Sequence, residues 1–272
     1  MNRLRPSSAA GFFYPGNKDK LIELIHILIG SVKSKKTFDQ ISGLVVPHAG
    51  YIYSGRTAAY AYETISEKKY KNIIIISPSH REYFAGNSVY IGDGYVTPLG
   101  TVEVNKTLVQ ELTSGSKTIF EGLEGHRQEH GIEVHLPFLQ VLYSDFKIVP
   151  IVMGDQSKIY IDELADKIAG VINNQTLIVA SSDLSHFYPR KIANELDSRV
   201  EKRINDYDYK GLYRDLEHKK CEACGGGPII AMMKSLDLIN KKNSLVLHRS
   251  DSGNASGDIT EVVGYLSAAI YN

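Results

Sequence analysis

Three histidine-bearing segments follow short apolar runs in this sequence, and their residue types suit metal or acid–base chemistry. The segments are Pro47-His48-Ala49-Gly50-Tyr51, Ser77-Pro78-Ser79-His80 and Ser181-Ser182-Asp183-Leu184-Ser185-His186. Neutral imidazole is the commonest protein ligand for zinc, copper and iron, and a metal needs ligands that converge from separate elements. One histidine after a strand is usually an ordinary surface residue, but three arranged alike favour a shared site.

Two residues could supply an anionic third ligand beside these histidines. One is Asp183, and the other is Cys224, which precedes the run Gly225–Gly227 and an apolar helix predicted over Ile229–Lys234. The unpaired amides at the start of that helix would stabilise a Cys224 thiolate. Two histidines with an anion and open positions describe both a catalytic zinc site and a non-haem iron site.

The cysteines leave alternatives open. Cys221 and Cys224 spell CxxC, a pattern found in dithiol redox sites and in zinc ribbons. A zinc ribbon needs a second such pair, which this chain lacks, and a thioredoxin-like motif would follow a first strand. An inert, buried Cys224 also remains an alternative.

A further cluster lies at Glu124–Pro137, where His126 and His130 stand four residues apart. On a helix this spacing would place both rings on one face, as in metal-binding pairs. Gly131 counts against a helix at this position. Glu129 and His130 could orient a ligand or transfer protons, or they could simply form a polar helix start capped by Glu129.

Composition narrows the class of protein. The 272 residues are 43% hydrophobic and 23% charged, and 31 basic side chains balance 31 acidic ones. A nucleic-acid-binding protein usually shows a basic excess, so we expect no nucleic-acid partner. Apolar runs are too short for a membrane helix and the chain shows no signal-peptide layout, so we expect no membrane association and a cytoplasmic location.

The elements that must position these residues alternate between strands and helices. Continuous β-branched runs predict strands at Leu44–Val46, Ile73–Ile76, Ile148–Met153, Leu177–Ala180, Leu245–Leu247 and Val262–Leu266. Apolar residues three and four apart predict helices at Lys18–Val32, Arg56–Ser66, Lys106–Leu112, Phe138–Tyr143, Ile159–Ile172 and Lys191–Tyr207.

This alternation predicts an α/β fold, namely a single three-layer α/β/α domain over residues 1–272 with a mixed, largely parallel sheet. The segments Val89–Ile91 and Val102–Val104, around Thr97–Gly100, are too closely spaced for crossovers. They predict a hairpin or edge strands. Ligands of open α/β sheets bind beyond the carboxyl ends of the strands, where the histidine segments lie.

With these motifs assembled in order, the chain resembles the Memo family, the Memo-like component of the prokaryotic AmmeMemoRadiSam system. The resemblance is carried by the His48 and His80 motifs, the segment Glu129–Pro137, the Ser181–His186 motif and Cys224-Gly225. It implies a fold similar to that of the class III extradiol dioxygenases. Those enzymes hold non-haem iron with two histidines and a carboxylate.

The resemblance also implies residue roles. His48, His80 and Cys224 correspond to the metal-site trio, which holds Fe(II) or copper in preference to zinc. His186 would transfer protons with Asp183 as its orienting partner, and His130 would assist. The chain would then be a metal-dependent, dioxygenase-like oxidoreductase of unknown substrate.

The alternative function is a non-catalytic module that binds a peptide or small ligand in a vestigial pocket. A radical-SAM protein as a pathway partner is implied only by the genomic association of the family. A cysteine in place of the carboxylate argues against ordinary aromatic-ring cleavage.

Overall fold

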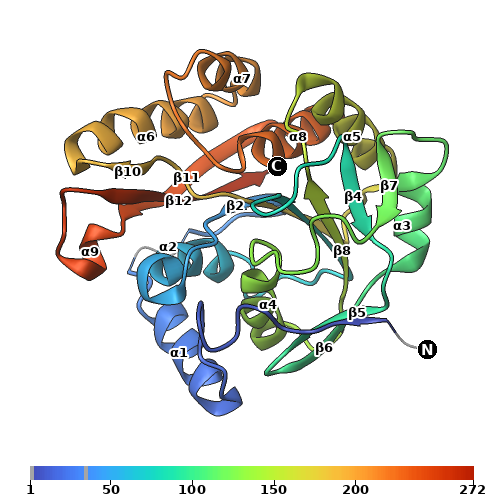
Figure 1. Ribbon diagram of the computed structural model, residues 1–272, viewed down its shortest axis with the longest axis horizontal. Helices are drawn as coiled ribbons and strands as arrows, with labels where there is room; N and C mark the ends of the chain where they lie inside the picture. Colours follow the sequence, from blue (N-terminus) through green and yellow to red (C-terminus); the bar gives the residue numbers. More distant parts are fainter. Residues whose placement is uncertain (1–2, 34–35) are drawn as a thin grey trace.

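Four parallel strands, almost wholly buried, form the centre of the main sheet. In spatial order they are β2 (Ile41–Val46), β9 (Thr176–Ser181), β3 (Asn72–Pro78) and β8 (Lys147–Met153). Their Ile and Val side chains suit strands that are covered on both faces. The computed structural model describes residues 3–33 and 36–272 (Figure 1).

Antiparallel pairings on both sides of this centre make the sheet mixed, as expected. The flanking strands are β10 (His186–Tyr188), β12 (Val262–Tyr271), β11 (Asn243–Asp251), β4 (Asn87–Tyr90) and β7 (Ile119–Gly122). β12 runs antiparallel to β2, and β10 and β11 run antiparallel to β12. β4 runs antiparallel to β8 and parallel to β7. Parallel pairing therefore dominates only at the centre.

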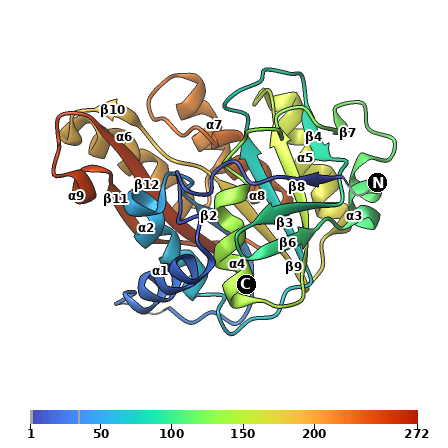
Figure 2. The ribbon, with the colours of Figure 1, turned by 60° about the horizontal axis from the view of Figure 1, so that its bottom comes forward.

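The hairpin predicted around Thr97–Gly100 is confirmed. It joins β5 (Gly94–Thr97) to β6 (Gly100–Glu103), and with β1 (Leu4–Arg5) it forms a separate three-stranded sheet. The Val89 segment is not its partner, because β4 lies inside the main sheet between β8 and β7. Figures 1 and 2 show the N-terminal segment running from β1 past α4 toward α1.

Helices cover both faces of the main sheet and give the predicted α/β layering (Figure 1). One side carries α1 (Lys18–Gly30), α2 (Tyr51–Glu63), the 3-10 turn η1 (Glu133–His135) and α4 (Leu136–Leu142). The other side carries α3 (Lys106–Thr113), α5 (Lys158–Val171), α6 (Arg190–Asn205), α7 (Tyr209–Glu217) and α8 (Gly226–Asp237). The short α9 (Gly253–Ser256) follows β11.

Two helices begin three or more residues earlier than their sequence patterns predict, and both begin beside the histidine loops. α2 starts at Tyr51 instead of Arg56, because the Tyr51 amide donates to the Phe13 carbonyl at 2.7 Å and the Tyr51 ring is buried. α8 starts at Gly226 instead of Ile229. Glycines disfavour a helix in isolation, but the packing at the start of this helix leaves little room for a larger residue. A Cβ on Gly226 would lie 2.5 Å from Leu216 Cδ1.

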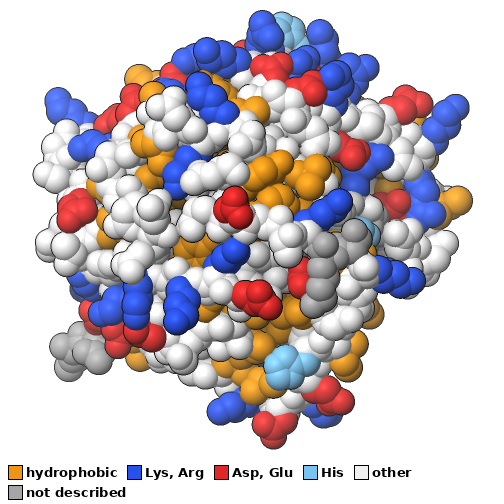
Figure 3. Space-filling model, turned by 180° about the vertical axis from the view of Figure 1, so that it is seen from behind, with side chains coloured by type: hydrophobic (Ala, Val, Ile, Leu, Met, Phe, Trp, Pro, Cys, Tyr) orange, Lys and Arg blue, Asp and Glu red, His pale blue; other side chains and the backbone are white. Residues whose placement is uncertain are grey.

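The surface fits the balanced charge of the sequence. On the face seen from behind, Lys and Arg side chains are interspersed with Asp and Glu (Figure 3). Within residues 3–33 and 36–272, no helix has both the length and the apolarity needed to cross a membrane.

Candidate metal centre

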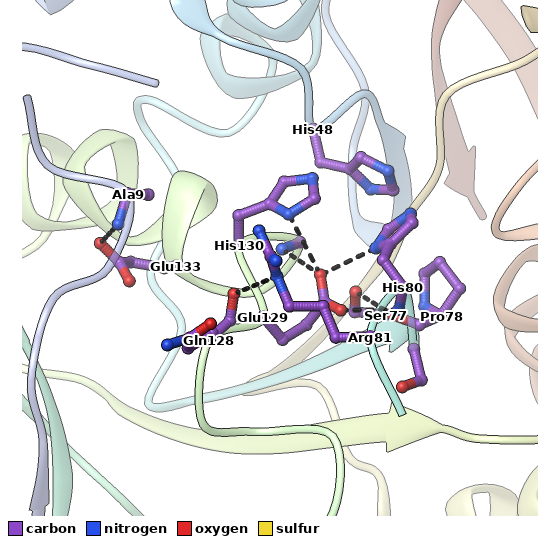
Figure 4. Close-up of polar contacts among 12 residues, drawn as sticks. Ala9, His48, Ser77, Pro78, His80, Arg81, Gln128, Glu129, His130 and Glu133 are labelled. Carbon is purple, nitrogen blue, oxygen red and sulfur yellow. Dashed lines mark hydrogen bonds and ion pairs between the residues drawn. The ribbon is translucent and has the colours of Figure 1, made fainter. Parts of the chain in front are cut away.

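The strand order brings the histidine loops together. β9 lies between β2 and β3, so the loops after these three parallel strands share one edge of the sheet. The rings of His48 and His80 lie 4.9 Å apart between centroids, nearly perpendicular to each other. His130 approaches from the segment before η1, with its ring centroid 5.4 Å from that of His48 (Figure 4).

Cys224 completes a compact group of three potential ligands. One ligand atom from each of His48, His80 and Cys224 lies within 4.8 Å of the others. The Cys224 sulfur is 3.2 Å from His48 Nε2 and accepts a hydrogen bond from the Asp183 amide at 3.2 Å. The chain reaches this position through Gly225, where a Cβ would lie 2.1 Å from the Ser181 carbonyl oxygen.

A buried serine fixes the tautomer of His48. The Ser181 hydroxyl donates its one proton to the Gly131 carbonyl at 2.6 Å. It must therefore accept from His48 Nδ1, at 2.7 Å, and from His135 Nε2, at 2.8 Å. His48 thus carries its proton on Nδ1, and the Nε2 lone pair faces Cys224.

Glu129 fixes His80 in the same tautomer. Its Oε1 accepts from His80 Nδ1 at 2.8 Å and its Oε2 accepts from the His80 amide at 2.8 Å (Figure 4). Burial acts to raise the pKa of Glu129, but the hydrogen bonds and charge of His80 outweigh it and hold the pKa at about 2. In the neutral His80 ring, this contact places the proton on Nδ1 and the lone pair on Nε2.

Burial keeps the His48 and His130 imidazoles in the neutral form that a metal ion binds, but it keeps the Cys224 thiol protonated. Desolvation and the neighbouring imidazoles hold the pKa of His48 well below its usual range. Burial likewise lowers the pKa of His130 to about 4. Burial and the nearby Asp183 raise the pKa of the Cys224 thiol.

The donor set fits a metal ion. Two imidazoles and one sulfur converge, and the thiol can donate its proton to His48 Nε2, 3.2 Å away, or to the Asp183 carbonyl, 3.5 Å away. A bound cation would replace that proton, since coordination deprotonates a thiol. Ser181 and Glu129 already accept hydrogen bonds from the Nδ1–H groups of His48 and His80, as acceptors beside metal-ligating histidines typically do.

Asp183 supports a different residue from the one expected. Its carboxylate accepts from the backbone amide of His48 at 2.8 Å, and Oδ2 lies 3.9 Å from His48 Nε2. It therefore stabilises the His48 loop, whereas the sequence suggested that it orients His186. Burial raises the pKa of Asp183 to about 7, against the lowering effect of the His48 and Ala49 amides.

His186 lies at the start of β10 and faces a cavity. The cavity has a volume of about 870 Å³ and is also lined by Cys224, Tyr188 and Glu222. Burial lowers the pKa of His186, so its ring is neutral at pH 7 and can accept a proton. A molecule in this cavity would therefore meet both the thiol and a neutral imidazole.

His126 and His130 do not form a pair on one helix. The segment between them is irregular, and the buried His126 ring points elsewhere. Its Nε2 donates to the Ser88 carbonyl at 3.0 Å, and its Nδ1 accepts from the Tyr95 hydroxyl at 2.7 Å. Gly131 disfavours a helix here, and Glu129 accepts hydrogen bonds from His80 instead of capping a helix.

Four residues of the hydrogen-bond and stacking network around the histidines were not predicted from the sequence. Ser181 and His135 both lie within recognised motifs, yet nothing in their spacing reveals that Ser181 links the two imidazoles. Tyr62 donates to His135 Nδ1 at 2.9 Å, from α2. Phe13 stacks on His130 at 4.4 Å between ring centroids, from the N-terminal segment.

Comparison with known proteins places this chain in a family. The model of the Memo-like proteins matches residues 5–269. The chain belongs to the Memo family. It is 37% identical to a MEMO1 family protein of Thermoplasma volcanium over 97% of each chain. It is 35% identical to another of Methanocaldococcus jannaschii, over 99% of this chain and all of that one.

A solved structure shares the fold of this Memo-family chain. An uncharacterised protein of Escherichia coli K12 superposes with a TM-score of 0.56 over 85% of this chain and all of that one. The identity is 13%, so the likeness concerns the fold alone.

The role of Ser181 leads to a first prediction. Ser181→Ala removes the acceptor that keeps the His48 proton on Nδ1, so we expect metal affinity to fall about 10–100-fold. Competition with a chelator of known affinity measures the change. The matched control is Ser267→Ala, which removes a buried hydroxyl without a hydrogen-bond partner among the described residues. Equal affinities in the two variants would contradict the role of Ser181.

Proposed function

We propose that this Memo-family chain is a metal-dependent oxidoreductase whose ion is held by His48, His80 and Cys224. The observation that carries the proposal is the convergence of two tautomer-fixed Nε2 lone pairs and one sulfur at the carboxyl edge of the sheet. Because both Nδ1 protons are already engaged, the rings are oriented before an ion arrives.

The donor set favours a redox-active ion. A thiolate is softer than the carboxylate of ordinary two-histidine iron sites and shifts preference toward copper, while imidazole suits both copper and iron. Fe(II) or copper, when bound, would supply one-electron redox chemistry at this place. Three protein ligands leave coordination positions open for a substrate.

The protein's own groups have defined roles in such a reaction. A substrate in the cavity would lie among residues that include Cys224, Gly227, His186 and Tyr188. The neutral His186 ring would accept a proton from it. Tyr188 donates to Glu222 at 2.6 Å, which fixes the polar rim of the cavity.

Anaerobic reconstitution tests the proposal. Purified protein is loaded with Fe(II) or Cu(I), freed of excess ion, and analysed for bound metal, thiolate charge-transfer absorption and oxygen consumption. We expect one thiolate-bound ion per chain and oxygen uptake with a suitable reductant. A chain that takes up no ion would overturn the proposal. A ligand bound equally well by the metal-free protein would instead favour a non-catalytic binding module.

His186 provides a second prediction. His186→Gln preserves the size of the side chain but removes the proton acceptor, so we expect turnover to fall about 10²–10⁴-fold while metal content stays unchanged. Oxygen uptake and metal analysis on the same sample separate the two effects. His218→Gln, at an exposed position on α7's C-terminal cap, is the control. Undiminished turnover in His186→Gln would remove this residue from the reaction.

A further inference from the structure

A second group of ligands lies next to the first and contains no sulfur. One ligand atom from each of His80, Glu129 and His130 lies within 4.8 Å of the others. His80 belongs to both groups. We propose that these three residues hold a second divalent metal ion, and that the His80 imidazole bridges the two ions through its two nitrogens.

The bonding of His130 is the first argument. Its Nδ1 is buried and has no hydrogen-bond partner among the described residues. The nearest carboxylate oxygen, Glu129 Oε1, lies 3.4 Å away and already accepts from His80 Nδ1 at 2.8 Å and from the Gly131 amide at 2.9 Å. A buried nitrogen without a partner costs free energy, and a cation bound between Nδ1 and Oε1 would give Nδ1 the partner that it lacks.

The rigidity of the group is the second argument. The His130 ring is stacked between Phe13, at 4.4 Å, and His80, at 4.8 Å, with an interplanar angle of 28° in each case. Gly131 allows the chain to pass close by, since a Cβ there would lie 2.2 Å from Ser77 Oγ. The three donors are thus held in place, and the rings of His80 and His130 both reach the Glu129 carboxylate (Figure 4).

In this proposal the two nitrogens of His80 are assigned to different groups. Nδ1 is directed at Glu129, and the tautomer leaves the Nε2 lone pair for the site with His48 and Cys224. Binding of the second ion would displace the Nδ1 proton to solvent, and the freed lone pair would coordinate the ion. Glu129 Oε1 keeps its hydrogen bond from Gly131 and turns its remaining lone pair to the cation.

The ligand types distinguish the two ions. Two imidazoles and a carboxylate suit Fe(II), Mn(II) or Zn(II), whereas the neighbouring thiolate site has a softer donor. Cobalt(II) is a suitable probe for both, because a thiolate ligand gives it an intense near-ultraviolet charge-transfer band that nitrogen and oxygen ligands do not give. The band therefore reports the Cys224 site alone, and the visible bands report both.

The test is an anaerobic titration of the full chain with cobalt(II). Wild type is expected to bind two equivalents, only one of which produces the charge-transfer band. His130→Ala and His130→Phe should each bind one equivalent with the band intact; the phenylalanine preserves the stack on Phe13. Cys224→Ser should retain one equivalent without the band. His26→Ala, at an exposed position on α1, should behave as wild type.

The outcomes separate the two sites. Saturation of wild type at one equivalent with the band, unchanged in both His130 variants, would overturn the second site and leave the first. Two equivalents in wild type and two in His130→Phe would also overturn it. A band that is absent from wild type would contradict the Cys224 site independently.

Discussion

Replacing Cys224 by serine is expected to lower the affinity of the thiolate site by more than about 100-fold, because losing groups that merely orient a ligand already costs 10–100-fold. The sulfur lies 3.2 Å from His48 Nε2, where the ion would replace the thiol proton. A serine hydroxyl does not ionise at neutral pH and is a much poorer ligand for a soft ion. Chelator competition with Cu(I) or Fe(II) measures the loss.

The second cysteine of this chain provides a matched control. Cys221 is also a free thiol and lines the same cavity, but it is buried and lies outside the group of convergent ligands. Cys221→Ser should therefore bind metal with wild-type affinity. If both cysteine variants lost the ion equally, the CxxC pair would be the metal or redox unit and the His48–His80–Cys224 site would be wrong.

The strands that position this centre could be predicted from the sequence, because a short continuous apolar run marks each of them. Continuous apolar runs identify β2, β3, β8 and β9, and a parallel centre places their carboxyl ends on one edge. The His48 and His80 loops follow directly from that topology. The starts of α2 and α8 do not follow, because tertiary contacts of Tyr51 and Gly226 determine them.

The groups around the ligands could not be predicted in this way. Ser181 links His48 to His135 through hydrogen bonds that depend on three separate elements meeting in space. The direction of the Asp183 side chain, toward the His48 amide, is likewise set by the loop conformation. Sequence spacing gives the residue types available at the sheet edge, whereas side-chain orientation decides which partners they have.

Glu133 shows how strongly this centre depends on a buried charge that sequence reasoning overlooked. We expect Glu133→Gln to lower the free energy of unfolding by about 3–5 kcal/mol at neutral pH, since one partner of a buried ion pair is removed. The carboxylate is paired with Arg5, whose guanidinium is also buried. It also accepts from the Ala9 amide at 2.9 Å and from the Tyr14 hydroxyl at 2.5 Å.

The pH dependence of this effect has a definite sign. Burial acts to raise the pKa of Glu133, but Arg5 and the hydrogen-bond donors outweigh it and lower the pKa from its ordinary value of 4.5. A depressed folded-state pKa stabilises the protein above the unfolded-state value and loses that stabilisation as the pH falls. The difference between wild type and Glu133→Gln should therefore be complete at neutral pH and shrink below about pH 4.5.

Urea unfolding at several pH values measures this difference, and an exposed ion pair provides the control. Asp145→Asn breaks the exposed contact with Lys71 and should cost less than about 1 kcal/mol at any pH. A pH-independent deficit in Glu133→Gln would show that packing, not charge, is lost. Because Glu133 anchors the segment that places Phe13 on His130, the variant should also weaken metal binding at the proposed His80–Glu129–His130 site more than at the proposed His48–His80–Cys224 site.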